Sequence, residues 1–204
     1  MNASLSFTLS ESKTVTGARA VLREKAGDDV RFEFYFEGRR NKDFEKKIHT
    51  FFGRIADYIP GLKAYEWRFE SRNTFPHSSG IASSASGFAA LSKILLSFEQ
   101  TLLGTYDDTF ASVKASFLAR LGSGSASRSI FPGINIWGHH PDIPGSSDLY
   151  AIPFPYEVHP VFDHFRDWIV LIDSGKKQVS STQGHALIDT HPFKNQRISV
   201  AEKI

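Results

Sequence analysis

The sequence predicts an α+β fold in which helices pack on one face of a mixed sheet. In several segments, apolar and polar residues alternate with a period of two, as in strands with one buried face. Two longer segments instead repeat apolar residues at helical spacing. Hydrophobic residues make up 41% of the 204 residues and include 18 Phe and 3 Trp, which is typical of a folded globular protein and not of a disordered one.

The alternating segments predict strands in the first half of the chain. Near the start, apolar residues alternate with hydroxyl residues (Leu5, Phe7 and Leu9), and two later runs alternate mainly with charged residues (Phe32, Phe34 and Phe36; Tyr65, Trp67 and Phe69). A period of two places one set of each run on a buried face. Plausible turns separate the first two runs from their neighbours, at Asp28-Asp29 and at Gly38 to Arg40.

Three segments predict helices. The first covers about residues 42–59, carries Phe44, Ile48, Phe51, Phe52 and Ile55, and ends at Pro60-Gly61. The second runs from Ile81 to about Leu103 and has Phe88, Leu91, Leu95 and Leu96 toward the core. The third lies near residues 107–120 and carries Phe110, Val113, Phe117 and Leu118.

The later part of the chain predicts a second domain. Residues 131–156 are rich in Pro and Gly, with short extended pieces at 134–137 and 150–154. The apolar run from Trp168 to Ile172 is typical of a strand buried on both faces, and the last stretch, from about residue 180, has helical character. We therefore expect one domain over residues 1–157 and part of a second, α/β domain over residues 158–204.

Composition narrows the function classes. The net charge is +2, with 24 basic and 22 acidic residues interspersed, so we expect no nucleic-acid partner. No apolar run approaches the roughly 18 residues that span a bilayer, and the N-terminus lacks the pattern of a signal peptide. Absence of cysteine excludes disulfides and cysteine-ligated zinc. We expect a cytoplasmic protein without a membrane partner.

The segment from Asn73 to Gly87 is the first candidate site. It is rich in small residues, follows a predicted strand and opens a predicted helix. The first N–H groups of a helix lack internal partners, and the helix dipole adds partial positive charge there, so such a turn suits a phosphate. The Ser83 and Ser84 hydroxyls could add hydrogen bonds or bind a phosphate-held Mg²⁺. A well-capped, closely packed helix start explains the same composition.

A second loop, from Gly122 to Ser129, surrounds Arg128 with serine hydroxyls and flexible backbone. The planar guanidinium suits a carboxylate or a phosphate, although a flexible turn with a surface Arg explains the pattern equally well. The segment from Asp173 to His185 is explained by plain helix capping. The eight His residues show no metal-binding spacing.

These motifs together resemble the diphosphomevalonate decarboxylases of the GHMP kinase superfamily. Asn73 to Gly87 resembles their phosphate-binding motif, and Gly122 to Ser129 resembles their substrate loop. Asn2 to Leu9 is similar to their early Asn-x-Ser strand, and Val179 to Gly184 is similar to a motif of their C-terminal domain. The resemblance implies a GHMP-kinase-like (ribosomal protein S5 domain 2-like) N-terminal domain followed by part of a ferredoxin-like α/β C-terminal domain.

The resemblance also implies an activity and roles for single residues. The family uses ATP to convert mevalonate 5-diphosphate to isopentenyl diphosphate, through phosphorylation of the tertiary hydroxyl and loss of phosphate and CO₂. Asn73, Ser83 and Ser84 would then contact ATP, with Ser84 near its Mg²⁺. Ser123 and Ser125 would bind the substrate diphosphate, and Arg128 would hold the carboxylate. Family members are often dimeric, which implies a homodimer.

The sequence departs from the family pattern inside the motifs and at both ends. Thr74 stands in place of a second Asn, His77 and Ser78 replace small apolar residues, and Ser127 replaces a frequent Cys. The family's first strand, with its Lys-Tyr-Trp-Gly-Lys signature, would precede Met1, and its general-base Asp would follow Ile204. We therefore expect an incomplete, inactive chain without that Asp. A mevalonate-type kinase that does not decarboxylate, and a non-catalytic domain that binds nucleotide or diphosphate, are the alternatives.

Overall fold

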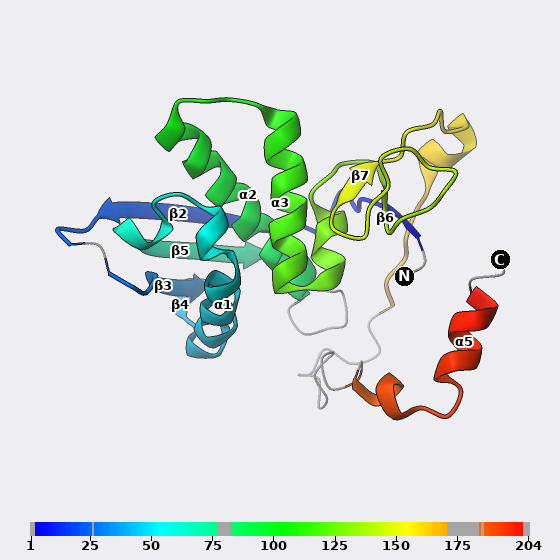
Figure 1. Cartoon of the computed structure of the whole chain (residues 1–204), viewed down its shortest axis with the longest axis horizontal. Helices are drawn as coiled ribbons and strands as arrows, with labels where there is room; N and C mark the ends of the chain where they lie inside the picture. Colours follow the sequence, from blue (N-terminus) through cyan, green and yellow to red (C-terminus); the bar gives the residue numbers. More distant parts are fainter. Residues whose placement is uncertain (1–2, 26, 77–82, 171–183, 185, 202–204) are drawn as a thin grey trace.

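The computed structural model describes residues 3–25, 27–76, 83–170, 184 and 186–201. It confirms the α+β class (Figure 1). The strands are β1 (Ser4–Phe7), β2 (Thr14–Leu22), β3 (Arg31–Phe36), β4 (Arg39–Arg40), β5 (Tyr65–Asn73), β6 (Ile134–Trp137) and β7 (Ala151–Pro153). The main helices are α1 (Lys42–Ile55), α2 (Ser83–Leu103), α3 (Asp108–Gly122) and α5 (Lys194–Ala201), and short 3₁₀ turns include η3 (Gly124–Ser129) and η4 (Pro160–His164).

The strands form two sheets. The larger sheet has the order β2-β5-β3-β4, in which β5 is antiparallel to β2 and parallel to β3, so it is mixed as predicted. The smaller sheet has the order β1-β6-β7 and is antiparallel. The sequence indicated strands in these places but did not indicate that they form a separate sheet.

The central strand β5 carries the core of the larger sheet. Trp67 and Phe69 are 2% and 0% exposed, whereas the residues that alternate with them, Glu66, Arg68 and Glu70, face solvent. The Trp67 and Phe69 rings stack with centroids 5.5 Å apart, and Phe98 of α2 meets Trp67 edge-on. Helices therefore cover one face of this sheet, as the alternation of buried and exposed residues predicted.

Helix α1 begins at a capped position and buries a single face. The Asn41 side-chain carbonyl accepts a hydrogen bond from the Phe44 N–H at 3.1 Å, which satisfies one of the free donors of the first turn. The buried residues recur at helical spacing, at Ile48, Phe51, Phe52 and Ile55. The predicted helix over 42–59 is therefore α1 followed by a 3₁₀ turn at Ala56–Tyr58.

Helices α2 and α3 pack closely because small residues line their contact. Ala89 of α2 and Ala115 and Ala119 of α3 are buried. Phe110, one of the apolar residues that the sequence placed on this helix, is 62% exposed, and small residues are buried on α3. One ion pair crosses the interface, where Lys114 Nζ lies 2.5 and 2.8 Å from the two carboxylate oxygens of Glu99.

Two predicted buried segments are exposed. Leu5 and Phe7 are 59% and 44% exposed, because β1 is an edge strand that turns its serines, and not its apolar residues, toward η3. Trp168 and Val170 are more than 80% exposed, at 81% and 82%. Residues 165–170 form no strand, and a buried strand needs neighbours on both sides, which the described residues do not supply here. Residues 171 and 172 lie outside the described residues.

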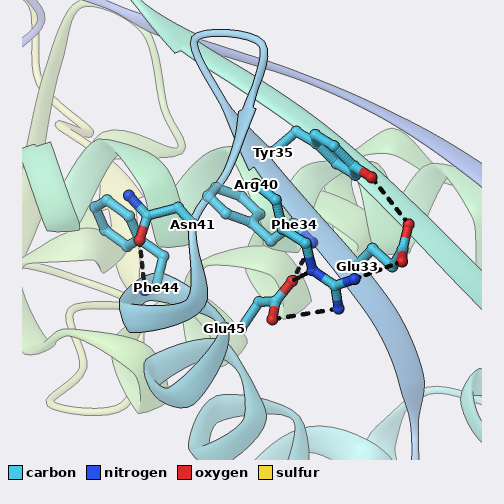
Figure 2. A network of polar contacts seen from close by, with 7 residues as sticks. All are labelled: Glu33, Phe34, Tyr35, Arg40, Asn41, Phe44 and Glu45. Atoms are coloured by element: carbon cyan, nitrogen blue, oxygen red, sulfur yellow. Dashed lines mark hydrogen bonds and ion pairs between the residues drawn. The ribbon is translucent and has the colours of Figure 1, made fainter.

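A polar network holds the start of α1 against β3 and β4 (Figure 2). Glu45 Oε1 accepts hydrogen bonds from Arg40 Nε at 2.8 Å and from the Phe34 N–H at 3.1 Å. Arg40 Nη1 donates to Glu33 Oε1 at 2.7 Å, and the Tyr35 hydroxyl donates to the other Glu33 oxygen. Desolvation raises the pKa of Glu45, but the bonds from Arg40 and Phe34 outweigh it and hold the pKa below its ordinary value.

We predict that Lys114→Met lowers the free energy of unfolding by roughly 3 kcal/mol, because it leaves the Glu99 carboxylate buried without its partner. The side chains of Lys114 and Glu99 are only 19% and 8% exposed. Lys46→Met is the matched control, since its pair with Asp43 is 82% and 88% exposed and contributes almost nothing. Chemical denaturation measures both. The double variant with Glu99→Leu should recover most of the loss, and an undiminished loss would contradict this account.

We also predict that the stabilising effect of Glu45 depends on pH. A lowered folded-state pKa means that the ionised carboxylate stabilises the fold above the unfolded-state pKa, and that this contribution is lost as pH falls through the folded-state pKa. Glu45→Gln should therefore be less stable than the wild type at pH 7, with the difference shrinking below about pH 4. Denaturation curves from pH 7 to pH 3 measure this, and a difference that stays constant with pH would contradict it.

Candidate functional site

The first candidate site lies where β5 leads into α2. Ser83 and Ser84 are the first two described residues of α2, and the predicted start at Ile81 lies outside the described residues. Ser83 is half-buried and Ser84 is exposed, so the Ser84 hydroxyl and the first N–H groups of the helix can meet an anion from solvent. His77 and residues 78–82, which complete the motif, lie outside the described residues.

A cavity adjoins this helix start. It is walled by rings from β3, α1 and α2 and has a few polar groups at its edge; its lining residues include Phe34, Phe36, Phe44, Phe88, Lys47, Thr14, Asn73, Ser83 and Ser84. The volume open to water is about 40 Å³, enough for a few waters and far below the roughly 300 Å³ of a small-molecule site. An adenine ring would enter this cavity only if its aromatic walls separated.

A hydroxyl bridge fixes the strand end against the helix. Thr14 Oγ1 lies 2.8 Å from Asn73 Oδ1 and 2.7 Å from Ser86 Oγ, and its single proton serves one of them at a time. The Ser86 hydroxyl donates to the Ser83 carbonyl at 3.2 Å, and the Asn73 N–H donates to Glu37 Oε1 at 3.0 Å. Asn73 thus lines the cavity, but its side-chain oxygen is engaged by the protein.

Thr14 and Ser86 were not singled out by the sequence. Thr14 reaches this site only because β2 pairs with β5 in a register that sets Thr14 opposite Asn73. That register is a long-range property, and no local motif around Thr14 signals it. Ser86 lies inside the small-residue motif, one turn after Ser83, so helical spacing could have grouped the two residues.

The residues at the start of α2 suit a Mg²⁺ ion that is held mainly by the phosphates of a bound nucleotide. Within the described ranges, no group of three His, Asp or Glu side chains could hold a metal. Mg²⁺ usually keeps several waters and takes one or two protein ligands plus substrate phosphates. The exposed Ser84 hydroxyl at the helix start could serve as one such protein ligand.

The second candidate site is built around Arg128 in η3. Its Nη1 donates to Ser4 Oγ at 2.6 Å and to Ser6 Oγ at 3.1 Å, and its guanidinium lies 5.9 Å from the centre of the Trp137 ring. The structure thus joins two of the motifs that the sequence singled out, the early Asn-x-Ser strand and the substrate loop. Ser4 and Ser6 were not predicted as site residues, although they belong to a motif that the sequence singled out.

The loop that carries Arg128 is an ordered turn. Ser127 is fully buried and donates to the Gly124 carbonyl at 3.0 Å, and Ser116 of α3 donates to the Ser127 carbonyl at 2.9 Å. Among the described residues, the hydroxyls of Ser123 and Ser125 have no hydrogen-bond partner, so both are free to bind a ligand. The turn η3 packs against α2 and α3, so the Arg128 turn is held in part by α2, the helix that carries the first site.

Several other expectations fall outside these two sites. The motif from Val179 to Gly184 lies outside the described residues, except Gly184. His139 and His140 lie in an exposed loop next to Ser146 and Asp148. No helix in the described part of the chain is long and apolar enough to cross a membrane.

The fold has close counterparts among solved structures. The mevalonate diphosphate decarboxylase of Staphylococcus aureus aligns over 100% of this chain and 56% of its own, with a TM-score of 0.70 and 28% identity. A structure described as MDDEF in complex with MVAPP, AMPPCP and magnesium aligns over 99% of this chain and 57% of its own, with a TM-score of 0.67 and 29% identity. The fold is therefore of the GHMP kinase type found in these decarboxylases.

Sequence comparisons narrow this class to one family. The diphosphomevalonate decarboxylase-like N-terminal domain matches residues 1–150. The diphosphomevalonate decarboxylase of Gibberella zeae is 32% identical over 191 residues, which are 90% of this chain and 47% of the relative. That of Ganoderma lucidum is 35% identical over 141 residues, or 69% and 33%. The chain belongs to the diphosphomevalonate decarboxylase family, and it spans half or less of the length of these relatives.

Proposed function

We propose that this chain is the nucleotide- and substrate-binding part of an ATP-dependent diphosphomevalonate decarboxylase. The proposed reaction converts mevalonate 5-diphosphate and ATP to isopentenyl diphosphate, CO₂, phosphate and ADP. The observation that carries the proposal is the family match over residues 1–150 together with Arg128 in a turn that also carries the unpaired hydroxyls of Ser123 and Ser125. A cytoplasmic location and a homodimer are extended to this chain from the family resemblance as part of the same proposal.

The start of α2 is the proposed phosphate end of the nucleotide site. ATP supplies the phosphoryl group when it is bound. Ser83 and Ser84 offer hydroxyls and helix N–H groups to its phosphates, Ser84 is the proposed minor Mg²⁺ ligand, and Asn73 borders the site. The named ligands of the solved relative, AMPPCP and magnesium, support this proposal.

Arg128 is the proposed carboxylate anchor, and Ser123 and Ser125 the proposed diphosphate ligands. The present partners of Arg128 are two neutral hydroxyls. A carboxylate adds the attraction of an opposite charge and can engage the guanidinium fork through both oxygens. Such a pair would hold the group that leaves as CO₂ in a defined orientation.

The chain by itself is proposed to bind without turning over. Resemblance places the general-base Asp outside these 204 residues, and the other half of the relatives' length is not represented here. The chain should therefore bind mevalonate 5-diphosphate weakly and release neither ADP nor CO₂. Ligand-observed NMR with each ligand, followed by assays for ADP and CO₂, tests both parts. Absence of binding would reject the binding role, and ADP release coupled to CO₂ would reject the inactivity.

We predict that Ser84→Ala, introduced at the matching position of a full-length family member, lowers kcat roughly 10²-fold, as expected for loss of a positioned donor to transferring phosphate. Ser97→Ala is the matched control on the same helix, since its exposed hydroxyl donates only to the Lys93 carbonyl. Steady-state kinetics measures both variants. Equal rates for Ser84→Ala and the wild type would remove Ser84 from the nucleotide site.

We predict that Arg128→Lys weakens binding of mevalonate 5-diphosphate by this chain at least about tenfold. Lys retains the charge but cannot present two parallel donors to a carboxylate. Arg19→Lys serves as the control, because Arg19 is exposed on β2 outside both sites. NMR titration gives the dissociation constants. An Arg128→Lys variant that binds as tightly as the Arg19→Lys variant would show that the guanidinium fork is not used.

A further inference from the structure

Asn135 is a buried amide without a partner. It is the second residue of β6, it is 1% exposed, and neither its side-chain oxygen nor its side-chain nitrogen has a hydrogen-bond partner. An amide carries two donors and two acceptor lone pairs, and burying it unpaired costs folding free energy. Val or Ile at this buried position of β6, which lies between β1 and β7, would avoid the cost of an unpaired polar group.

The strand register places this amide on the Arg128 side of the smaller sheet. Asn135 is directly opposite Ser6 in the β1–β6 pair, and directly opposite residues project to the same face with Cβ atoms about 5 Å apart. Ser6 Oγ accepts from Arg128 at 3.1 Å. Trp137, two residues along β6, shares this face and also approaches the Arg128 guanidinium. Ser4, Ser6, Arg128, Trp137 and Asn135 therefore form one group.

Among the described residues, two other buried side chains have unpaired atoms, Ser92 and Gln100. Both lie within α2 and belong to the helical core. Asn135 differs because it lies opposite Ser6, whose hydroxyl accepts from the Arg128 cation that the proposed function assigns to substrate. Its free donors and acceptors are therefore placed where a ligand carboxylate would arrive.

We propose that Asn135 is a specificity-determining residue for the carboxylate end of the substrate, an assignment that rests on the proposed function. A ligand with a carboxylate and a neighbouring hydroxyl attracts the Arg128 guanidinium away from Ser4 and Ser6. The Asn135 amide then pairs with this end, its N–H donating to a carboxylate oxygen and its carbonyl accepting from the hydroxyl. The class of ligand is a 3-hydroxy acid, and a bare diphosphate makes neither contact.

Asn135→Val tests the assignment, because it removes the polar atoms and suits a buried strand. The Tm of the free chain should rise by about 2–4 °C when an unpaired polar group is removed. The dissociation constant for mevalonate 5-diphosphate should rise at least about tenfold, whereas that for inorganic diphosphate should stay unchanged. A higher Tm together with weaker binding of mevalonate 5-diphosphate alone is the result expected of a residue whose polar atoms bind ligand and do not stabilise the fold.

Ser92→Ala is the matched control, since it removes another unpaired buried group far along α2, and it should change neither affinity. Unchanged affinity of Asn135→Val for mevalonate 5-diphosphate would overturn the assignment while leaving the proposed function intact. A lower Tm, or a variant that does not fold, would show that the amide is structural and would overturn it as well. A wild-type chain that does not bind mevalonate 5-diphosphate would overturn the proposed function and this assignment together.

Discussion

The pairing of strand β5 with a neighbour on each of its edges is the constraint on which the rest of this structure depends. Strand β5 is flanked by β2 and β3, and its buried face presents Trp67 and Phe69 to the helices. The same strand ends at Asn73, whose backbone and side chain are held by Glu37 and Thr14. The position of the α2 start, and with it the proposed phosphate site, therefore follows from how this strand is anchored.

A second constraint joins distant parts of the chain. Arg128 bonds to Ser4 and Ser6, which are 124 and 122 residues earlier, and β1 pairs with β6 beside them. Closing a loop of this length costs entropy that only stable contacts can offset. The buried supports of η3, through Ser116 and Ser127, supply part of that stability. The Arg128 site is thus set by tertiary structure and not by its own loop sequence.

This difference explains what the sequence could predict. The strands around Phe34 and Trp67 and the face of α1 follow from periodicity, because burial against one layer imposes a period of 2 or 3.6. The chemical character of the loops at Ser84 and Arg128 follows from residue type, and the family follows from the order of motifs. The partners of Arg128, the role of Thr14 and the exposure of Phe7 do not follow, since each depends on which strands pair. Alternation predicts that β1 is a strand, but only its pairing decides which face is covered.

Arg128 is held by the protein itself in this state, and the cavity at the proposed nucleotide site is small. The cavity beside α2 is closed to about 40 Å³, and Arg128 is held by two hydroxyls. A ligand carboxylate must replace two bonds from a charged guanidinium to neutral hydroxyls, each already contributing about 1.5–3 kcal/mol, and its gain is the attraction between two opposite charges. Internal pairing therefore reduces affinity and favours ligands that bond to both sides of the guanidinium. Such a site selects ligands by geometry more than by charge. A single negative oxygen replaces only one of the two hydrogen bonds that Arg128 makes to Ser4 and Ser6.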